Sequence, residues 1–165
     1  MSGKLGLMMA LALTASLGAY ASQRPLPTTN SDAATRKTID DALATAKSDR
    51  RIVLLNFGAD WCPECRVLDK VFADPAVASF LKTNFIVVKI NVGSMVGVNY
   101  TEKNIDLTMK YGAFTTKDSI AIPFIIVLNA AGNVLDRTNK GEWKHAPAIT
   151  PENVLAALKN WAPKR

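Results

Sequence analysis

The chain has 165 residues, of which 48% are hydrophobic, and this is enough for one ordinary domain with a buried core. Its formal net charge is +6 and only 7% of its residues are aromatic; with no clustered basic stripe or stacking residues, the composition argues against a nucleic-acid-binding protein. Its two cysteines, Cys62 and Cys65, are close neighbours in the sequence. A bridge between them would close almost no loop, which excludes a fold held together by disulfide staples.

The first residues have the pattern of an export signal. Lys4 precedes an apolar run from Leu5 to Leu17, and Ala19-Tyr20-Ala21 has the small-x-small pattern of a signal-peptidase site. The run has about thirteen residues, fewer than the roughly twenty that a transmembrane helix needs. We therefore expect residues 1–21 to be a cleaved signal peptide, with an uncleaved membrane anchor as the alternative. The mature protein is expected in the periplasm, without stable insertion into the membrane.

The mature chain begins with a leader and continues as one domain. Residues 22–31 are rich in Pro, Thr, Ser and Asn and predict a flexible leader, whereas residues 32–165 predict a single domain. Apolar residues at three-to-four spacing predict a helix over 32–48, and a short apolar run predicts a buried strand over 52–57.

The next helix has a well-marked start. Cys62 can be its N-cap, Pro63 takes the first helical position, and Glu64 lies in the first turn, where acids are favoured. Asp74-Pro75 ends this helix and caps a further one that reaches about Leu81.

The second half of the chain predicts alternating strands and helices. The expected elements are a strand over 85–90, a loop over 91–101, a helix over 102–111, an irregular stretch over 112–121, a strand over 124–128, a turn at 130–133 that returns through Val134 and Leu135, a loop over 136–150, and a last helix after Thr150-Pro151. A right-handed crossover makes the first two strands parallel neighbours, and the turn makes the last two a hairpin. The order predicts an α/β sandwich around a mixed sheet.

The spacing of the cysteines indicates redox chemistry. Residues three apart lie on one side of a helical turn, where two sulfurs can form a disulfide. The helix N-terminus favours an anion, so Cys62 is the expected nucleophilic thiolate. Cys65 lies one turn inside, is expected to be the more buried of the two, and would resolve the mixed disulfide.

Two other interpretations of the pair remain open. Cys-x-x-Cys can be half of a structural zinc site, but four ligands are typical and the only histidine is His145. The pair could also be a permanently oxidised clasp, although so short a loop contributes little stability.

The chain resembles the thioredoxin superfamily over about residues 51–161. It is most similar to small periplasmic thioredoxin-like proteins and to the C-terminal thioredoxin-like domain of the bacterial transmembrane disulfide reductase. The residues that carry the likeness are Ala59-Asp60-Trp61-Cys62-Pro63-Glu64-Cys65, the later Asp74-Pro75, and Ile122-Pro123 before an apolar strand. The resemblance implies a thioredoxin-like three-layer sandwich, with a central mixed sheet flanked by helices.

The resemblance also implies roles for single residues. Pro123 would be cis and packed beside the sulfurs, and the backbone of Ile122 would pair with an extended substrate. Trp61 would cover the thiols, with ordinary core packing as the alternative. Thioredoxins have a buried acid six positions before the first cysteine, where this chain has Asn56. Either water or Glu64 would then move the proton of Cys65, or the second step would be slower. The alternative role of Glu64 is that of a favourable acid at the start of the helix.

The segments 93–100 and 115–121 are longer than in a minimal thioredoxin. They are expected either to form a rim that selects the partner protein or to be neutral surface insertions.

The predicted function is that of an exported thiol–disulfide oxidoreductase, of the protein-disulfide reductase type. A negative Glu64 between the cysteines disfavours the reduced thiolate and so favours a reducing pair. The alternatives are a mild thiol oxidase and a Cu(I)-handling module that uses the same two cysteines. The expected partners are oxidised protein substrates and a membrane disulfide reductase as electron donor. We expect a monomer that needs no cofactor and no metal, because the cysteines hold the electrons.

Overall fold

A computed structural model of the protein describes residues 33–96, 99–112, 122–138, 143 and 145–164. The predicted signal peptide, the leader and the segment 115–121 lie outside these residues. The elements are α1 (Ala33–Asp49), β1 (Ile52–Gly58), α2 (Pro63–Phe72), α3 (Pro75–Asn84), β2 (Phe85–Asn91), β3 (Gly93–Val96), β4 (Asn99–Glu102), α4 (Ile105–Tyr111), β5 (Phe124–Leu128), β6 (Val134–Arg137), the 3-10 turn η1 (Ala146–Ala148) and α5 (Pro151–Trp161).

A four-stranded sheet in the order β2-β1-β5-β6 forms the centre of the fold. β1 and β2 are parallel and in register from Ile52 opposite Phe85 to Gly58 opposite Asn91. β5 runs antiparallel to β1, and β6 runs antiparallel to β5. The predicted mixed sheet, with its parallel first pair and its terminal hairpin, is confirmed.

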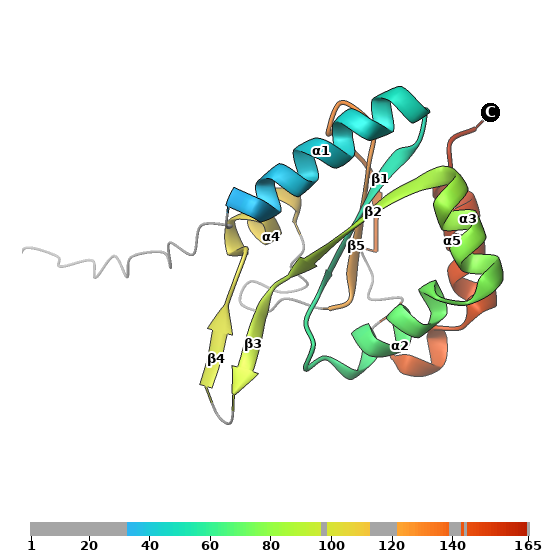
Figure 1. Ribbon diagram of the computed structural model, residues 1–165. Helices are drawn as coiled ribbons and strands as arrows, with labels where there is room; N and C mark the ends of the chain where they lie inside the picture. The colour runs from blue at the N-terminus through green and yellow to red at the C-terminus, as the bar shows by residue number, and fades with distance from the viewer. Residues whose placement is uncertain (1–32, 97–98, 113–121, 139–142, 144, 165) are drawn as a thin grey trace, which may run out of the picture.

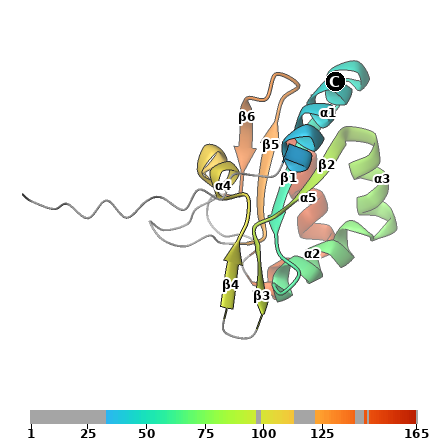
Figure 2. The same cartoon turned by 60° about the vertical axis from the view of Figure 1, so that its left-hand side comes forward.

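Helices cover both faces of this sheet, as Figure 1 and Figure 2 show: α1 and α4 lie on one side and α2, α3 and α5 on the other. Strand side chains point alternately to the two faces. Leu55 therefore packs in the cluster that includes residues of α1, whereas Leu54 packs with Leu68 of α2 and Leu158 of α5. All three leucines of that second group are fully buried, and each contributes about 1.5–3 kcal/mol by leaving water. The three-layer sandwich is confirmed.

Side-chain caps set the starts of the helices on the α2 side. Asp74 accepts hydrogen bonds from the backbone N–H groups of Ala76 and Val77, at 2.9 and 3.3 Å. Thr150 accepts one from the N–H of Asn153 at 3.2 Å. These side chains satisfy amides that have no partner within the helix. The predicted starts are confirmed, while α3 extends three residues beyond the predicted Leu81, to Asn84.

The expected loop over 91–101 is instead a β-hairpin, so this prediction is wrong. β3 and β4 pair antiparallel from Gly93 opposite Glu102 to Val96 opposite Asn99. The side chain of Asn91 accepts a hydrogen bond from the N–H of Gly93 at 2.8 Å, and Gly93 has φ 144, a conformation that favours glycine. In the sequence, the glycine predicted an irregular segment. Backbone N–H and C=O groups that leave a sheet still need hydrogen-bond partners, and here those of β3 and β4 pair with each other.

The pairing of the hairpin also moves the start of the next helix to a later residue. The N–H of Lys103 donates to the carbonyl of Val92 at 3.0 Å, which keeps the chain extended beyond β4. Asn104 has φ 54 and immediately precedes α4. The helix therefore begins at Ile105 rather than at the predicted Glu102.

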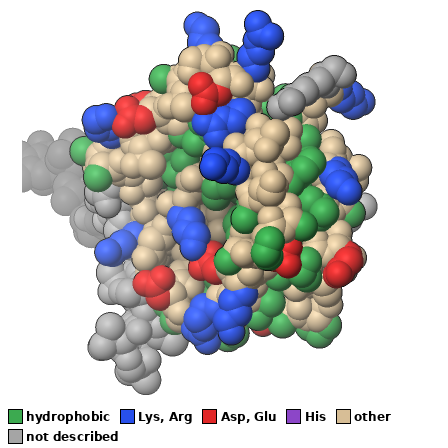
Figure 3. All heavy atoms as spheres, turned by 45° about the vertical axis from the view of Figure 1, so that its right-hand side comes forward, with side chains coloured by type: hydrophobic (Ala, Val, Ile, Leu, Met, Phe, Trp, Pro, Cys, Tyr) green, Lys and Arg blue, Asp and Glu red, His purple; other side chains and the backbone are tan. Residues whose placement is uncertain are grey.

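On the face that carries α3 and α5, basic and acidic side chains are interspersed among apolar ones (Figure 3). In the part of the chain that the structure describes, none of the helices combines the length and the apolar character needed to cross a membrane.

Candidate redox site

The two cysteines lie at the start of α2, just after the connection from β1. Cys62 is the N-cap of α2, with φ −79 and ψ 116, and Pro63 follows at the first helical position. The two residues form a disulfide, with their Cα atoms 5.3 Å apart. The backbone N–H of Cys65 donates to Cys62 Sγ at 3.1 Å. The sulfur of Cys62 therefore faces the positive end of the α2 dipole and an amide donor, and both favour a thiolate there after reduction.

The relative burial of the cysteines differs from the prediction. Cys62 is 2% exposed and Cys65 is 7% exposed, so Cys65 is not the more buried residue. The expectation considered only the position along α2. In the folded protein Cys62 lies against the segment around Ile122, and Cys65 lines a partly open cavity on its other side.

The segment before β5 lies directly against Cys62. The Ile122–Pro123 peptide bond is cis, the geometry that the resemblance implied. The carbonyl oxygen of Ile122 lies 3.8 Å from Cys62 Sγ. In the disulfide this sulfur has no proton, so the contact becomes a hydrogen bond only when Cys62 is a thiol. Pro123 is buried and Ile122 is half-buried.

Trp61 links the site to the hairpin. Its ring Nε1–H donates to the carbonyl of Gly93 at 3.2 Å, and its side chain is half-buried against the core cluster that includes both cysteines. This arrangement agrees with core packing of Trp61, while its role as a cover of the thiols stays a prediction. Pro63 is exposed, and Glu64 is half-buried in the first turn of α2.

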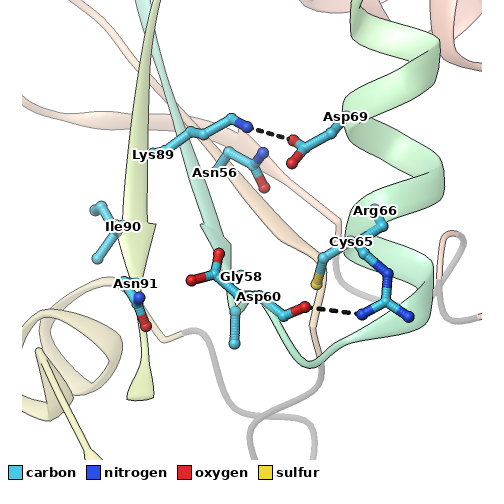
Figure 4. A pocket seen from close by; sticks show the side chains of 10 residues that line it. Asn56, Gly58, Asp60, Cys65, Arg66, Asp69, Lys89, Ile90 and Asn91 are labelled. Carbon is cyan, nitrogen blue, oxygen red and sulfur yellow. Dashed lines mark hydrogen bonds and ion pairs between the residues drawn. The ribbon is translucent and has the colours of Figure 1, made fainter. Parts of the chain in front are cut away.

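Asn56 lies beneath α2, on the face of β1 that carries Leu54. It is 6% exposed, and its Oδ1 atom is completely buried without a hydrogen-bond partner in the described part of the protein. Asn56 lines a cavity together with Cys65, Asp69 and Lys89 (Figure 4). Asn56, which stands where the resemblance implied an acid, thus lines the same cavity as Cys65.

Sequence reasoning missed Asp69 and Lys89. Asp69 follows Cys65 by four residues, a spacing that places two side chains on one helix face. Lys89 is the register partner of Asn56 on the neighbouring parallel strand. Nζ of Lys89 lies 2.6 Å from Oδ1 of Asp69. The helical spacing could have identified Asp69, but Lys89 required the strand register.

The chemistry available at this site is two-electron thiol–disulfide exchange. The cysteine pair itself stores the electrons as a dithiol or a disulfide. Among the residues that the structure describes, no three His, Cys, Asp or Glu side chains gather in a way that could hold a metal ion.

Comparison with known proteins agrees with this geometry. The model of the thioredoxin-like family matches residues 33–130. The solved structure of a disulphide isomerase from Xylella fastidiosa Temecula1 is 30% identical, with a TM-score of 0.66 over 82% of this chain and 95% of that chain. A thioredoxin from Thermus thermophilus, 22% identical, has a TM-score of 0.51 over 73% of this chain and 80% of that chain, which shows the fold alone.

Two curated relatives match a shorter segment. Thiol:disulfide interchange protein DsbD 2 of Pseudomonas aeruginosa is 47% identical over 45 residues, which are 27% of this chain and 8% of that protein. Thiol:disulfide interchange protein DsbD of Vibrio vulnificus is 42% identical over 55 residues, 33% of this chain and 9% of that protein. The chain therefore spans less than a tenth of the length of these curated relatives. The family model, by contrast, covers most of the described domain, including β1, α2 and both cysteines. With its disulfide at the N-terminus of α2, the chain belongs to the thioredoxin-like family of thiol–disulfide oxidoreductases.

Proposed function

We propose that this protein is an exported protein-disulfide reductase that cycles Cys62 and Cys65 between dithiol and disulfide. The observation that carries the dithiol–disulfide cycle in this proposal is the position of Cys62, which caps α2 and accepts the amide hydrogen bond of Cys65. This geometry favours the thiolate of Cys62 and places the second sulfur within reach of the first.

The proposed reaction has two steps. The thiolate of Cys62 attacks one sulfur of a substrate disulfide, and the other substrate sulfur leaves as a thiolate. Cys65 then attacks Sγ of Cys62, which forms the Cys62–Cys65 disulfide and releases the substrate as a dithiol. The protein loses two electrons and the substrate gains them, so a donor must reduce the protein again.

The docking of the substrate is proposed at the cis-proline segment. An extended substrate segment would pair with the backbone of Ile122, beside Pro123, as in other strand-addition interactions. Because the Ile122 carbonyl is 3.8 Å from Cys62 Sγ, a segment bound there would hold its disulfide next to the nucleophile. Trp61 would cover the opposite side of the site.

Export and the electron donor are supported by different features. The signal-like pattern before Ser22 supports export to the periplasm. The matches to two DsbD proteins support a membrane disulfide reductase as the donor. Mass spectrometry of the protein isolated from the periplasm tests the first point: a mature N-terminus at Ser22 is expected, and an intact Met1 would contradict cleavage.

The reductase direction is supported by charge at the first turn of α2. Glu64 is half-buried there, and a negative charge at this place disfavours the thiolate form of the reduced pair. Arg66 directs its guanidinium to the backbone carbonyl of Asp60, at 2.8 Å. A less stable thiolate lowers the reduction potential, which makes the pair more reducing.

The deciding experiment is the equilibrium reduction potential of the pair, titrated against dithiothreitol or glutathione. A potential near or below about −230 mV is expected for a reductase, and a value near about −120 mV would contradict that direction and favour an oxidase. Absence of a reversible two-electron couple would contradict the redox function itself and make Cu(I) binding the next function to test. Cys65→Ala should trap substrates as mixed disulfides, and Cys62→Ala should trap none.

Disulfide isomerase activity is the second candidate. It is favoured by the 30% identical disulphide isomerase, of which this chain covers 95%. Refolding of a scrambled, disulfide-containing substrate protein distinguishes the two activities. An isomerase restores native pairing with catalytic amounts of reduced protein, whereas a reductase only releases thiols and is consumed without a donor.

A further inference from the structure

A partly open cavity of about 200 Å³ lies behind Cys65. Its lining includes Cys65, but neither Cys62 nor Ile122. It is therefore separate from the place where the cis-proline segment contacts the nucleophile. Cys65 is accessible from this cavity, whereas Cys62 lies against Ile122, where the substrate is proposed to dock.

The lining of this cavity includes the buried amide of Asn56. Asn56 Oδ1 is buried there without a partner in the described part of the protein, and an unpaired amide oxygen in a dry site costs about 1–3 kcal/mol. The volume is about 200 Å³, several times the roughly 30 Å³ that one water molecule occupies in the liquid. Water that paired with Asn56 would remove this penalty, in a cavity that Cys65 also lines.

Asp69 is the carboxylate of the cavity lining that belongs to the same helix as Cys65. It lies four residues after Cys65 on the same face of α2 and is half-buried. Lys89 Nζ holds its Oδ1 at 2.6 Å from the facing strand. Figure 4 shows Asn56 reaching from β1 towards α2, between Asp69 and Cys65.

We infer that this cavity is the proton route of the resolving cysteine, with Asp69 as the proton acceptor in place of a buried acid at position 56. The inference rests on the proposed dithiol–disulfide cycle. In the second step, the thiol of Cys65 passes its proton through water to the Asp69 carboxylate. The resulting thiolate attacks Sγ of Cys62, the Cys62–substrate bond breaks, and the substrate sulfur leaves with the electron pair and takes up a proton. In the reverse direction, Cys65 leaves as a thiolate and Asp69 returns the proton.

The other charged groups at the cavity are Asp60, Arg66 and Lys89. Asp60 is exposed and precedes Cys62, and its carboxylate lies at the end of the cavity near Gly58 and Asn91 (Figure 4). Glu64, the acid that the sequence offered for proton transfer, does not line the cavity. Asp69 is thus the acid that combines partial burial with the helix face of Cys65.

A two-phase thiol titration tests this route. Reduced protein, produced from the full chain, is mixed with excess dithiobis-nitrobenzoate, and release of the coloured thiol is followed by stopped flow. The first equivalent reports attack by Cys62 and depends on reagent concentration. The second reports attack by Cys65 on the mixed disulfide and is independent of it. Both phases are measured as a function of pH for the wild type, Asp69→Asn, Asp69→Glu and Asp60→Asn.

Asp69→Asn is expected to slow the second phase at least about tenfold at neutral pH and to move its pH profile upward. This is less than the full ~10²-fold effect of a positioned base, because solvent hydroxide can enter the cavity. The rate of the first phase should change little in Asp69→Asn, and Asp69→Glu should restore the rate of the second phase. In Asp60→Asn, the rate of the second phase should stay within about twofold of the wild-type rate, as for loss of an exposed charge. An unchanged second phase in Asp69→Asn, or an equal effect of Asp60→Asn, would overturn the route. If the wild type released only one equivalent, the failure would instead belong to the proposed dithiol cycle.

Discussion

Replacing Asn56 by leucine tests whether this buried amide is a stability cost of the site. Asn56 is 6% exposed on a strand whose other residues from Ile52 to Phe57 are buried and apolar. Its Oδ1 has no protein partner in the described residues. Leucine has a similar length, and the adjoining cavity of about 200 Å³ can accept its second methyl group.

The expected change follows from two contributions. Removing an under-satisfied amide oxygen recovers about 1–3 kcal/mol, and burying leucine contributes up to about 1.5–3 kcal/mol. Part of the cavity remains open, and water that pairs with the amide reduces the first contribution. Asn56→Leu is therefore expected to stabilise the oxidised protein by about 1–3 kcal/mol, within the sum of these contributions.

Urea unfolding of the oxidised protein, followed by far-ultraviolet circular dichroism, measures this change as a higher midpoint at an unchanged slope. Leu54→Ala, two residues earlier on the same strand face and fully buried, is the control for sensitivity and should cost about 2–5 kcal/mol. If Asn56→Leu lost more than about 1 kcal/mol, the amide would be making hydrogen bonds that hold the fold, and the reasoning from its unpaired oxygen would be refuted. A more stable variant with a slower Cys65 step would show that stability is given up at this position for proton transfer.

Three further changes test other parts of the site. Asp74→Ala removes the acceptor of two amide hydrogen bonds and should lower the free energy of unfolding by about 1 kcal/mol in urea titration; an unchanged midpoint would contradict the capping role. Gly58→Ala introduces a Cβ that would lie 3.3 Å from Cys65 Sγ, so the Cys65 phase of the thiol titration should slow while the Cys62 phase stays the same, and equal slowing of both would indicate a general distortion. Trp61→Phe loses the 3.2 Å hydrogen bond to the carbonyl of Gly93 and should reduce stability by about 1 kcal/mol. Limited proteolysis should then cleave the β3–β4 hairpin faster than in the wild type, and identical cleavage would show that this bond does not hold the hairpin.

Local signals in the sequence were sufficient for the frame of the fold. Cys62, Asp74 and Thr150 each stand before a proline, and all three cap helices in the structure. N-cap side chains and a proline at the first position act within one turn, so their effect can be read without knowing the rest of the fold. The apolar runs of β1 and β5 likewise identify strands covered on both faces.

The hairpin of β3 and β4 was not predictable in the same way. Its glycines favoured a loop, but β3 and β4 pair with each other in a two-stranded sheet of their own. Hydrogen bonds that involve Asn91 and Val92 then set its position. Such partners are chosen by the three-dimensional surroundings, which overrule weak local preferences.

The sequence by itself determined the cysteine pair, the place of Cys62 as the N-cap of α2 and the amide in place of an acid at position 56. These features depend on residue type and on spacing within one helical turn. Only the tertiary structure decided how the two sulfurs are exposed and which base pairs with the acid four residues after Cys65. Cys62 is in contact with Ile122, sixty residues away in the chain. The cavity beside Cys65 is lined by residues of α2, β1 and β2. The pairing of Asp69 with Lys89 depends on how a helix packs over a parallel strand pair. Burial and charge pairing between distant segments are properties of packing, and no local pattern encodes them.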